Sequence, residues 1–211
     1  MNPPQGATKD KGRAMKKTLV LAGDAAEDLD TMYPIFRLRE AGYEVHVAAP
    51  TRRKVKLVVH DFEEGWDAYT ERPGRHLPVD LAFSEVEPEE YSALVIPGGR
   101  APEYIRMDPD VARICTSFFE RGLPVGLICH GVQVPAALGL LRGRTVSGFP
   151  PLRPDLEAAG ATFQAGPDVV DGNVVSCTGW PDMPEFSRAF LSVLEVSDAS
   201  SRRAAHDASI G

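Results

Sequence analysis

Cysteine is scarce in this chain: the 211 residues include three, Cys115, Cys129 and Cys177. Three cysteines without a CxxC pair cannot form the disulfide framework of a small secreted domain, and they argue against a cysteine-ligated zinc site. Long apolar runs are also missing, since the longest, such as Ala93–Pro97 and Leu123–Cys129, are far too short to span a bilayer. These absences predict a protein of the reducing cytoplasm that has no membrane partner.

Basic residues are in the minority as well. The chain has 23 Lys and Arg against 30 Asp and Glu, a formal net charge of -7. This excess of acid argues against a nucleic-acid partner, which would require a basic face.

His46, His76 and His206 show no metal-ligand spacing, so we expect no metal site. We also expect no organic cofactor.

Short apolar runs alternate with segments of helical periodicity. Buried strands are predicted at Thr18–Gly23, Glu44–Ala49, Ala93–Pro97 and Pro124–Ile128. The segments between them, such as Asp28–Ala41, have the spacing and the end signals of helices. This alternation predicts βαβ units and an α/β fold with a mostly parallel sheet covered on both faces.

The length and composition predict one domain flanked by two tails. Residues 1–17 form a predicted disordered tail, residues 18–196 the domain, and residues 197–211 a flexible tail. Within the domain, Asp61–Leu77 places aromatic residues, proline and glycine among charges, and we interpret it as an excursion from the sheet. The last helix is expected from about Pro184 to Val196.

The most informative segment is Pro124–Gly131, in which a predicted strand runs directly into Cys129 and His130, and a predicted helix over His130–Leu141 follows. This order resembles a nucleophile elbow, although the serine form GxSxG is absent. The helix N-terminus would favour the thiolate, which is the reactive form of cysteine. The alternative is a small core cysteine at a strand end, but the order of elements favours a nucleophile.

Two other segments end strands at the same edge of the predicted sheet. The backbone N–H groups of Gly98 and Gly99 could complete an oxyanion site beside Cys129, although Pro-Gly-Gly is usually only a turn. Glu27 follows the first strand. A carboxyl group near a thiolate should have a raised pKa and could transfer protons, whereas the alternative is a helix-start acid that interacts with the helix dipole.

Together these stretches resemble the DJ-one/ThiJ/PfpI superfamily over about residues 18–196. The similarity is greatest to PfpI-like cysteine peptidases and to the glyoxalase–deglycase branch. The matching stretches are Gly23–Asp28, Tyr33–Pro34, His60–Phe62, Leu94–Tyr104, Ile128–Gly131 and Gly139–Gly143. The resemblance implies a flavodoxin-like three-layer sandwich with a mostly parallel central sheet and a nucleophile elbow.

The resemblance also implies roles for individual residues. Cys129 would be the nucleophile, Glu27 the acid beside it and His130 the adjacent base. Glu103 would orient the histidine, in PfpI-type assemblies from a neighbouring subunit. We therefore expect a homo-oligomer, a dimer or larger, with the site near the subunit interface.

Other side chains are weaker candidates. His60 could contact the substrate or make a structural hydrogen bond to a neighbouring loop. Trp66, Tyr69 and Trp180 could line a pocket or an interface, but burial in ordinary contacts is the better interpretation. Cys115 lies on the apolar face of its predicted helix and Cys177 ends a predicted strand, so both are expected to be structural.

Three residues depart from the pattern of the family. Met183 and Phe149 stand where relatives often carry histidine and tyrosine, and Pro135 is unexpected after the Cys-His-Gly stretch. These departures leave the nucleophile intact and bear on the identity of the substrate.

The leading functional hypothesis is cysteine-dependent chemistry on a small electrophile. The resemblance implies glyoxalase or deglycase activity on 2-oxoaldehydes, in which Cys129 attacks the aldehyde, Glu27 or His130 moves a proton between the two carbons, and water releases a hydroxyacid. The alternatives are a PfpI-type peptidase or amidase, a hydratase, and a non-enzymatic redox sensor or chaperone in which peroxide oxidises Cys129.

Overall fold

A computed structural model describes residues 16–210 of the protein, and gives the backbone alone for residues 201, 202 and 204–210. The predicted N-terminal tail therefore lies outside the described residues except at its last two positions. Lys17, the last of them, is the first residue of strand β1. In the described part of the chain no helix is long and apolar enough to cross a membrane.

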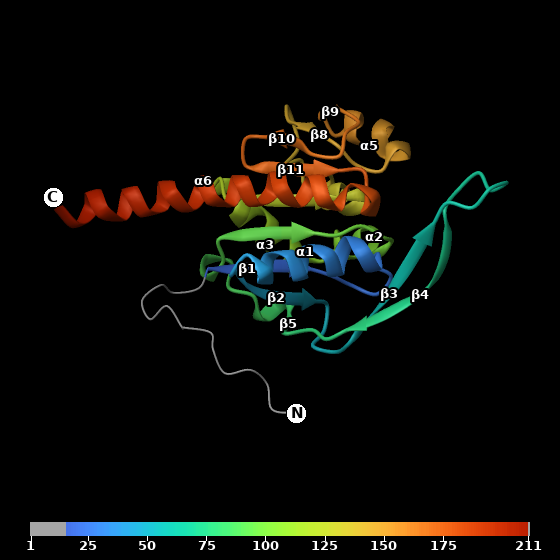
Figure 1. Cartoon of the computed structure of the whole chain (residues 1–211), viewed down its shortest axis with the longest axis horizontal. Coiled ribbons are helices and arrows are strands. Elements are labelled where there is room, and N and C mark those ends of the chain that lie inside the picture. The colour runs from blue at the N-terminus through green and yellow to red at the C-terminus, as the bar shows by residue number, and fades with distance from the viewer. Residues whose placement is uncertain (1–15, 211) are drawn as a thin grey trace.

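A seven-stranded sheet forms the centre of the molecule, with strand order β10-β11-β7-β6-β1-β2-β5 (Figure 1). All neighbouring strands are parallel except β10 and β11, which confirms the predicted mostly parallel sheet. The strands are β1 (Lys17–Leu21), β2 (Glu44–Ala49), β5 (Leu81–Ala82), β6 (Ala93–Ile96), β7 (Val125–Ile128), β10 (Val169–Asp171) and β11 (Val174–Cys177).

Helices cover both faces of this sheet. Successive residues of a strand point to opposite faces, so Val20 packs in one apolar cluster while Leu19 and Leu21 pack in the other. Helices α1 (Asp28–Glu40) and α6 (Met183–Ile210) pack on the Val20 face, and α3 (Pro109–Glu120) packs on the opposite face. The predicted three-layer α/β sandwich is thereby confirmed.

Shorter helices are α2 (Ala101–Ile105), α4 (Gln133–Ala137), α5 (Arg153–Ala158), and the 3-10 turns η1 (Phe83–Glu85), η2 (Pro88–Glu90), η3 (Cys129–Val132), η4 (Pro150–Leu152) and η5 (Trp180–Asp182).

The excursion predicted at Asp61–Leu77 contains a strand that the sequence analysis missed. Strands β3 (Val55–Asp61) and β4 (Thr70–Leu77) form an antiparallel hairpin that projects from the body (Figure 1). The backbone of Ala25 and Ala26 pairs with β3, and the buried Asp28 carboxylate pairs with Arg75 of β4. The hairpin is therefore anchored beside the carboxyl end of β1. A second small sheet pairs β8 (Thr145–Val146) with β9 (Thr162–Phe163).

Two predicted helix boundaries are wrong. The helix expected over His130–Leu141 is the 3-10 turn η3 followed by the short α4, because the turn at Cys129 is too tight to open directly into an α-helix. The last helix does not end at Val196: α6 continues to Ile210, so most of the segment predicted as a flexible tail is helical. The buried Asp198 accepts hydrogen bonds from Lys16 and Tyr43, which ties the extension to the residues directly before β1 and β2.

Candidate active site

The carboxyl ends of β1, β6, β7 and β11 meet at one edge of the sheet, where ligands bind in open α/β folds. The backbone N–H of Glu27, after β1, donates to the Gly98 carbonyl after β6 at 3.1 Å. Gly179, after β11, lies so close to Cys129 that an added Cβ would stand 3.7 Å from Sγ. The structure thus brings together the three segments singled out in the sequence, together with a fourth that follows β11.

Cys129 occupies the elbow. Its φ is +54°, a left-handed conformation that is uncommon for a residue with a side chain and is found at strained functional turns. Ile128 before it is extended, and the turn η3 begins at Cys129 itself. The Sγ atom lies 3.2 Å from Nδ1 of His130. The predicted strand–nucleophile–turn geometry is therefore present.

The electrostatics of Cys129 differ from the sequence-based expectation. The residue is 8% exposed, and burial together with the nearby Asp30 carboxyl raises the pKa of the thiol well above its ordinary value. The backbone N–H groups of His130 and Gly99 act in the opposite direction and lower this pKa. Burial therefore favours the thiol, which is opposite in direction to the effect predicted for the helix N-terminus.

Two carboxyl groups lie beside the thiol. Glu27 is the N-cap of α1, and its Oε2 accepts a hydrogen bond of 2.7 Å from the backbone N–H of Asp30. Burial raises the pKa of Glu27, and burial together with the neighbouring Glu27 raises the pKa of Asp30 well above its ordinary value. Both groups line the same cavity as Cys129. Glu27 is therefore the helix-start acid of the alternative interpretation, and it also lines the cavity.

Asp30 is the site residue that the sequence analysis missed. It is fully buried, and neither of its carboxyl oxygens has a hydrogen-bond partner within normal geometry among the described residues. Such a group is costly unless a ligand or a reaction uses it. The available signal was spacing, because residues three apart on a helix share a face; Asp30 stands three positions after Glu27.

Gly98 separates Asp30 from Cys129. A Cβ added at Gly98 would stand 2.5 Å from Oδ2 of Asp30 and 2.5 Å from Cβ of Cys129. Gly99 adopts φ +79°, and a Cβ there would meet the Ala25 carbonyl oxygen at 2.3 Å. The paired glycines are therefore needed for close backbone approach, which is more than an ordinary Pro-Gly-Gly turn requires.

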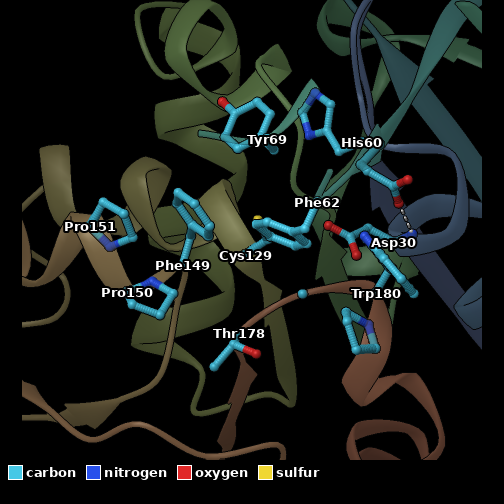
Figure 2. A pocket seen from close by; sticks show the side chains of 13 residues that line it. Asp30, His60, Phe62, Tyr69, Cys129, Phe149, Pro150, Pro151, Thr178 and Trp180 are labelled. Atoms are coloured by element: carbon cyan, nitrogen blue, oxygen red, sulfur yellow. Dashed lines mark hydrogen bonds between the residues drawn. The ribbon is translucent and has the colours of Figure 1, made fainter. Parts of the chain in front are cut away.

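A cavity of about 260 Å³ opens over these groups. Figure 2 shows His60, Tyr69 and Phe149 around one side of Cys129, with Thr178 and Trp180 on another side. The Nε1 atom of Trp180 is buried and has no hydrogen-bond partner among the described residues. Tyr69 and Trp180 therefore line the pocket, in contrast to the ordinary packing that we favoured for them.

His60 makes a structural hydrogen bond, one of its two predicted roles, and also lines the cavity. It lines the cavity, and its Nε2 lies 3.1 Å from Oε2 of Glu71 on β4. Arg100 holds Glu71 by two hydrogen bonds of 2.7 and 2.6 Å, which lowers the pKa of that carboxyl to about 2. The ring of His60 stacks on Tyr69 with centroids 4.2 Å apart. This chain of contacts fixes the hairpin against the cavity.

The remaining candidates lie in different environments. Glu103 lies in α2, half-buried, and is not among the residues that line the cavity of its own chain. Trp66 is 66% exposed at the end of the hairpin. Cys115, Cys177 and Met183 are buried in the apolar clusters, and Pro135 is buried in α4. Among the side chains that the structure describes, no group of three or more His, Cys, Asp or Glu could hold a metal ion.

His130 should remain a neutral base well below neutral pH. Burial, with a smaller effect from His60, lowers its pKa to about 4. Since an unfolded histidine has a pKa near 6.5, the unfolded state binds more protons between these values, and this residue makes stability rise with pH across that window. NMR titration of the imidazole should show half-protonation near pH 4 in the folded protein and about two units higher in urea. A folded-state midpoint above pH 6 would contradict this assignment.

Conservative substitutions of Glu27 and Asp30 should change turnover while the protein keeps its fold. Glu27→Gln and Asp30→Asn keep size but cannot exchange a proton, so each should slow turnover by about 100-fold. A carboxyl group whose pKa is raised in the folded state makes the protein less stable as the pH rises above the pKa of that group in the unfolded chain. Asp30→Asn should therefore unfold at higher urea concentration than wild type at pH 7. Wild-type rates at every pH in both variants would remove the pair from the reaction.

Comparisons with known proteins identify a family and relatives that this chain resembles. Residues 16–193 match the model of the family described as DJ-1/PfpI. The chain is 40% identical to Deglycase TK1284 of Thermococcus kodakarensis over 84% of this chain and 99% of that relative. It is 34% identical to Putative cysteine protease YraA of Bacillus subtilis over 85% of this chain and 99% of that protein.

Solved structures show the same fold. A two-domain protein with DJ-1/ThiJ/PfpI-like and ferritin-like domains from Anabaena variabilis has a TM-score of 0.73 at 32% identity, covering 85% of this chain and 48% of that one. Schizosaccharomyces pombe DJ-1 has a TM-score of 0.69 at 18% identity, covering 87% of this chain and 97% of that one. The second likeness bears on the fold alone.

Proposed function

The chain belongs to the DJ-1/PfpI family, as its motifs predicted, and on that premise we propose that it is a cofactor-independent enzyme of the glyoxalase or deglycase type. Its substrates would be 2-oxoaldehydes, free or in their early adducts with amines. The observation that carries the proposal is the Cys129 thiol, held at an elbow with φ +54°, 3.2 Å from a histidine nitrogen and beside two buried carboxyl groups.

The first step is attack by Cys129 on the aldehyde carbon. Because the resting group is a thiol, the proton must leave as the carbon–sulfur bond forms, and Nδ1 of His130 is placed to accept it. The imidazolium then gives this proton to the former aldehyde oxygen, which completes a hemithioacetal. The backbone N–H groups of Gly99 and His130 stabilise negative charge that develops on sulfur.

The second step moves hydrogen between the two substrate carbons. A carboxylate of the Glu27–Asp30 pair takes the proton from the first carbon and returns it to the second. The hydroxyl proton on the oxygen of the first carbon passes to the oxygen of the second, which completes the conversion of the hemithioacetal into a thioester. The raised pKa values make either carboxylate a stronger base than a solvated one. Water then cleaves the thioester, so that one 2-oxoaldehyde and one water give one 2-hydroxyacid and the free thiol.

A peptidase or amidase would begin with the same attack and expel an amine. The likeness to Putative cysteine protease YraA supports this second candidate, but a cavity of about 260 Å³ fits a small molecule better than an extended peptide. The low exposure and raised pKa of Cys129 disfavour a primary role in peroxide sensing, because sensor cysteines are exposed thiolates.

The test is a parallel screen of methylglyoxal, a methylglyoxal–amine adduct, peptide amides and nitriles, without glutathione and with a chelator present. We expect lactate to form in step with loss of methylglyoxal, and to be absent with Cys129→Ala. Amide hydrolysis without lactate would establish the peptidase instead. Activity restored by zinc after chelation would show a metal site that the proposal lacks.

The proposed oligomer gives a prediction for Glu103, whose action on His130 of a partner subunit rests on the family resemblance. Chains with Cys129→Ser and chains with Glu103→Gln, each impaired alone, should complement when subunits exchange. In an isologous dimer, about half of the pairs are mixed and each mixed pair has one intact site, so about a quarter of wild-type activity should return. Native mass spectrometry would verify exchange. No recovery after complete exchange would place Glu103 in its own chain's site or outside the mechanism.

A further inference from the structure

We propose that the site selects neutral 2-oxoaldehydes that carry an aromatic or similarly bulky apolar group, in preference to methylglyoxal and to anionic substrates. This inference rests on the proposed function and narrows its substrate class. It is carried by the composition of the cavity, by the absence of a cation in its lining, and by the placement of two aromatic rings at its opening.

The lining is aromatic and proline-rich away from the reacting groups. Besides Cys129, Glu27, Asp30 and Thr178, it contains His60, Phe62, Tyr69, Phe149, Pro150, Pro151, Gly179, Trp180 and Pro181. Phe149 and Phe62 line the same cavity as Cys129 (Figure 2), so a substituent on the attacked carbonyl would lie among them. Aromatic faces and proline rings gain free energy when they bury an apolar group, which methylglyoxal offers only as one methyl.

The rings at the opening are arranged to hold a flat group. Phe149 stacks against His130 with centroids 5.0 Å apart, and Phe62 lies nearly parallel to Phe149 with centroids 6.5 Å apart. Phe62 is 63% exposed although it is a large apolar side chain. A bound aromatic ring would cover part of that exposed surface, which a small aldehyde cannot reach.

The charge of the cavity lining is the reason to expect a preference for neutral over anionic substrates. Among the residues that the structure describes, no lysine or arginine lines the cavity, whereas two buried carboxyl groups do. Arg100, on the β6 loop, is held by both oxygens of Glu71. An anionic substrate would have to lose its hydration without gaining a cation, and it would approach Glu27 and Asp30. Carboxylated and phosphorylated aldehydes are therefore disfavoured.

The kinetic test compares phenylglyoxal with methylglyoxal. We expect kcat/KM to be about tenfold or more higher for phenylglyoxal, the difference that one or two buried methylene groups can supply. Phe62→Ala should lower the ratio of the two kcat/KM values by about tenfold. Trp66→Ala is the matched control, because Trp66 is equally exposed in the same hairpin but does not line the cavity. It should leave the ratio unchanged.

A second readout does not require turnover. Acetophenone, acetone and benzoylformate would be compared for their ability to slow alkylation of Cys129 by iodoacetamide, followed by peptide mass spectrometry. Acetophenone should protect, and acetone and benzoylformate should not. If no 2-oxoaldehyde is converted, the proposed function fails while this protection pattern still supports the neutral aromatic preference. If the aldehydes are converted but the ratio is near one and acetophenone protects no better than acetone, the proposed function stands and the preference is overturned.

Discussion

Cys129→Ser is expected to lower turnover of every productive substrate by at least about 1,000-fold while leaving the fold intact. A serine hydroxyl has a pKa far above that of a thiol, and its neighbouring base is weak, since burial lowers the pKa of His130 to about 4. A base of that strength can assist a thiol as it attacks but cannot activate an alcohol. Initial rates at substrate concentrations below KM give the comparison most directly.

The control for this variant must separate chemistry from packing. Cys115→Ala removes a core cysteine that does not line the cavity, and burial raises the pKa of its thiol to about 12. It should lose stability and keep kcat, whereas Cys129→Ser should keep its circular dichroism and its midpoint in urea. Turnover by Cys129→Ser within tenfold of wild type would remove this residue from the nucleophile role.

Structural features that depend on residues adjacent along the chain could be predicted from the sequence. Strand β7 runs directly into the turn at Cys129, and strand β6 runs almost directly into Gly98 and Gly99, so both strand-end turns were visible in the sequence. The alternation of strands and helices likewise predicted the three layers. Motif spacing also placed Glu27 at the same edge of the sheet, because parallel strands all end there.

Features that depend on distant segments could not be predicted. The pKa of the Cys129 thiol is set by burial under loops from β1, β6 and β11, and no local pattern reports that burial. Asp30 resembled an ordinary acid in a first helical turn until the fold placed Gly98 against it. Strand β4 contains Pro73, Gly74 and several charges, so its pairing with β3 is specified by tertiary contacts such as Asp28–Arg75.

Gly131, the third residue of the Cys-His-Gly stretch, lets the turn at Cys129 pack closely against strand β6. Its Cα lies against the end of β6, and a Cβ added there would stand 2.1 Å from the Ile96 carbonyl oxygen and 3.1 Å from that of Pro97. Both obstacles are backbone atoms, so no rotamer change relieves the overlap. The turn that carries Cys129 and His130 can approach the neighbouring strand this closely only if the third residue has no side chain.

Gly131→Ala should therefore cost about 3 kcal/mol or more of unfolding free energy, near the upper end for overpacked sites. For a chain of this size that corresponds to a fall in Tm of about 6–12 °C. Turnover should also fall, because moving η3 away from β6 changes the position of Cys129. Gly139→Ala is the control: Gly139 has φ +70° with nothing within 4 Å of an added Cβ, so it measures backbone strain without a clash and should cost about 1 kcal/mol. Equal losses in the two variants, measured by urea unfolding, would show that the contact with β6 does not constrain the elbow.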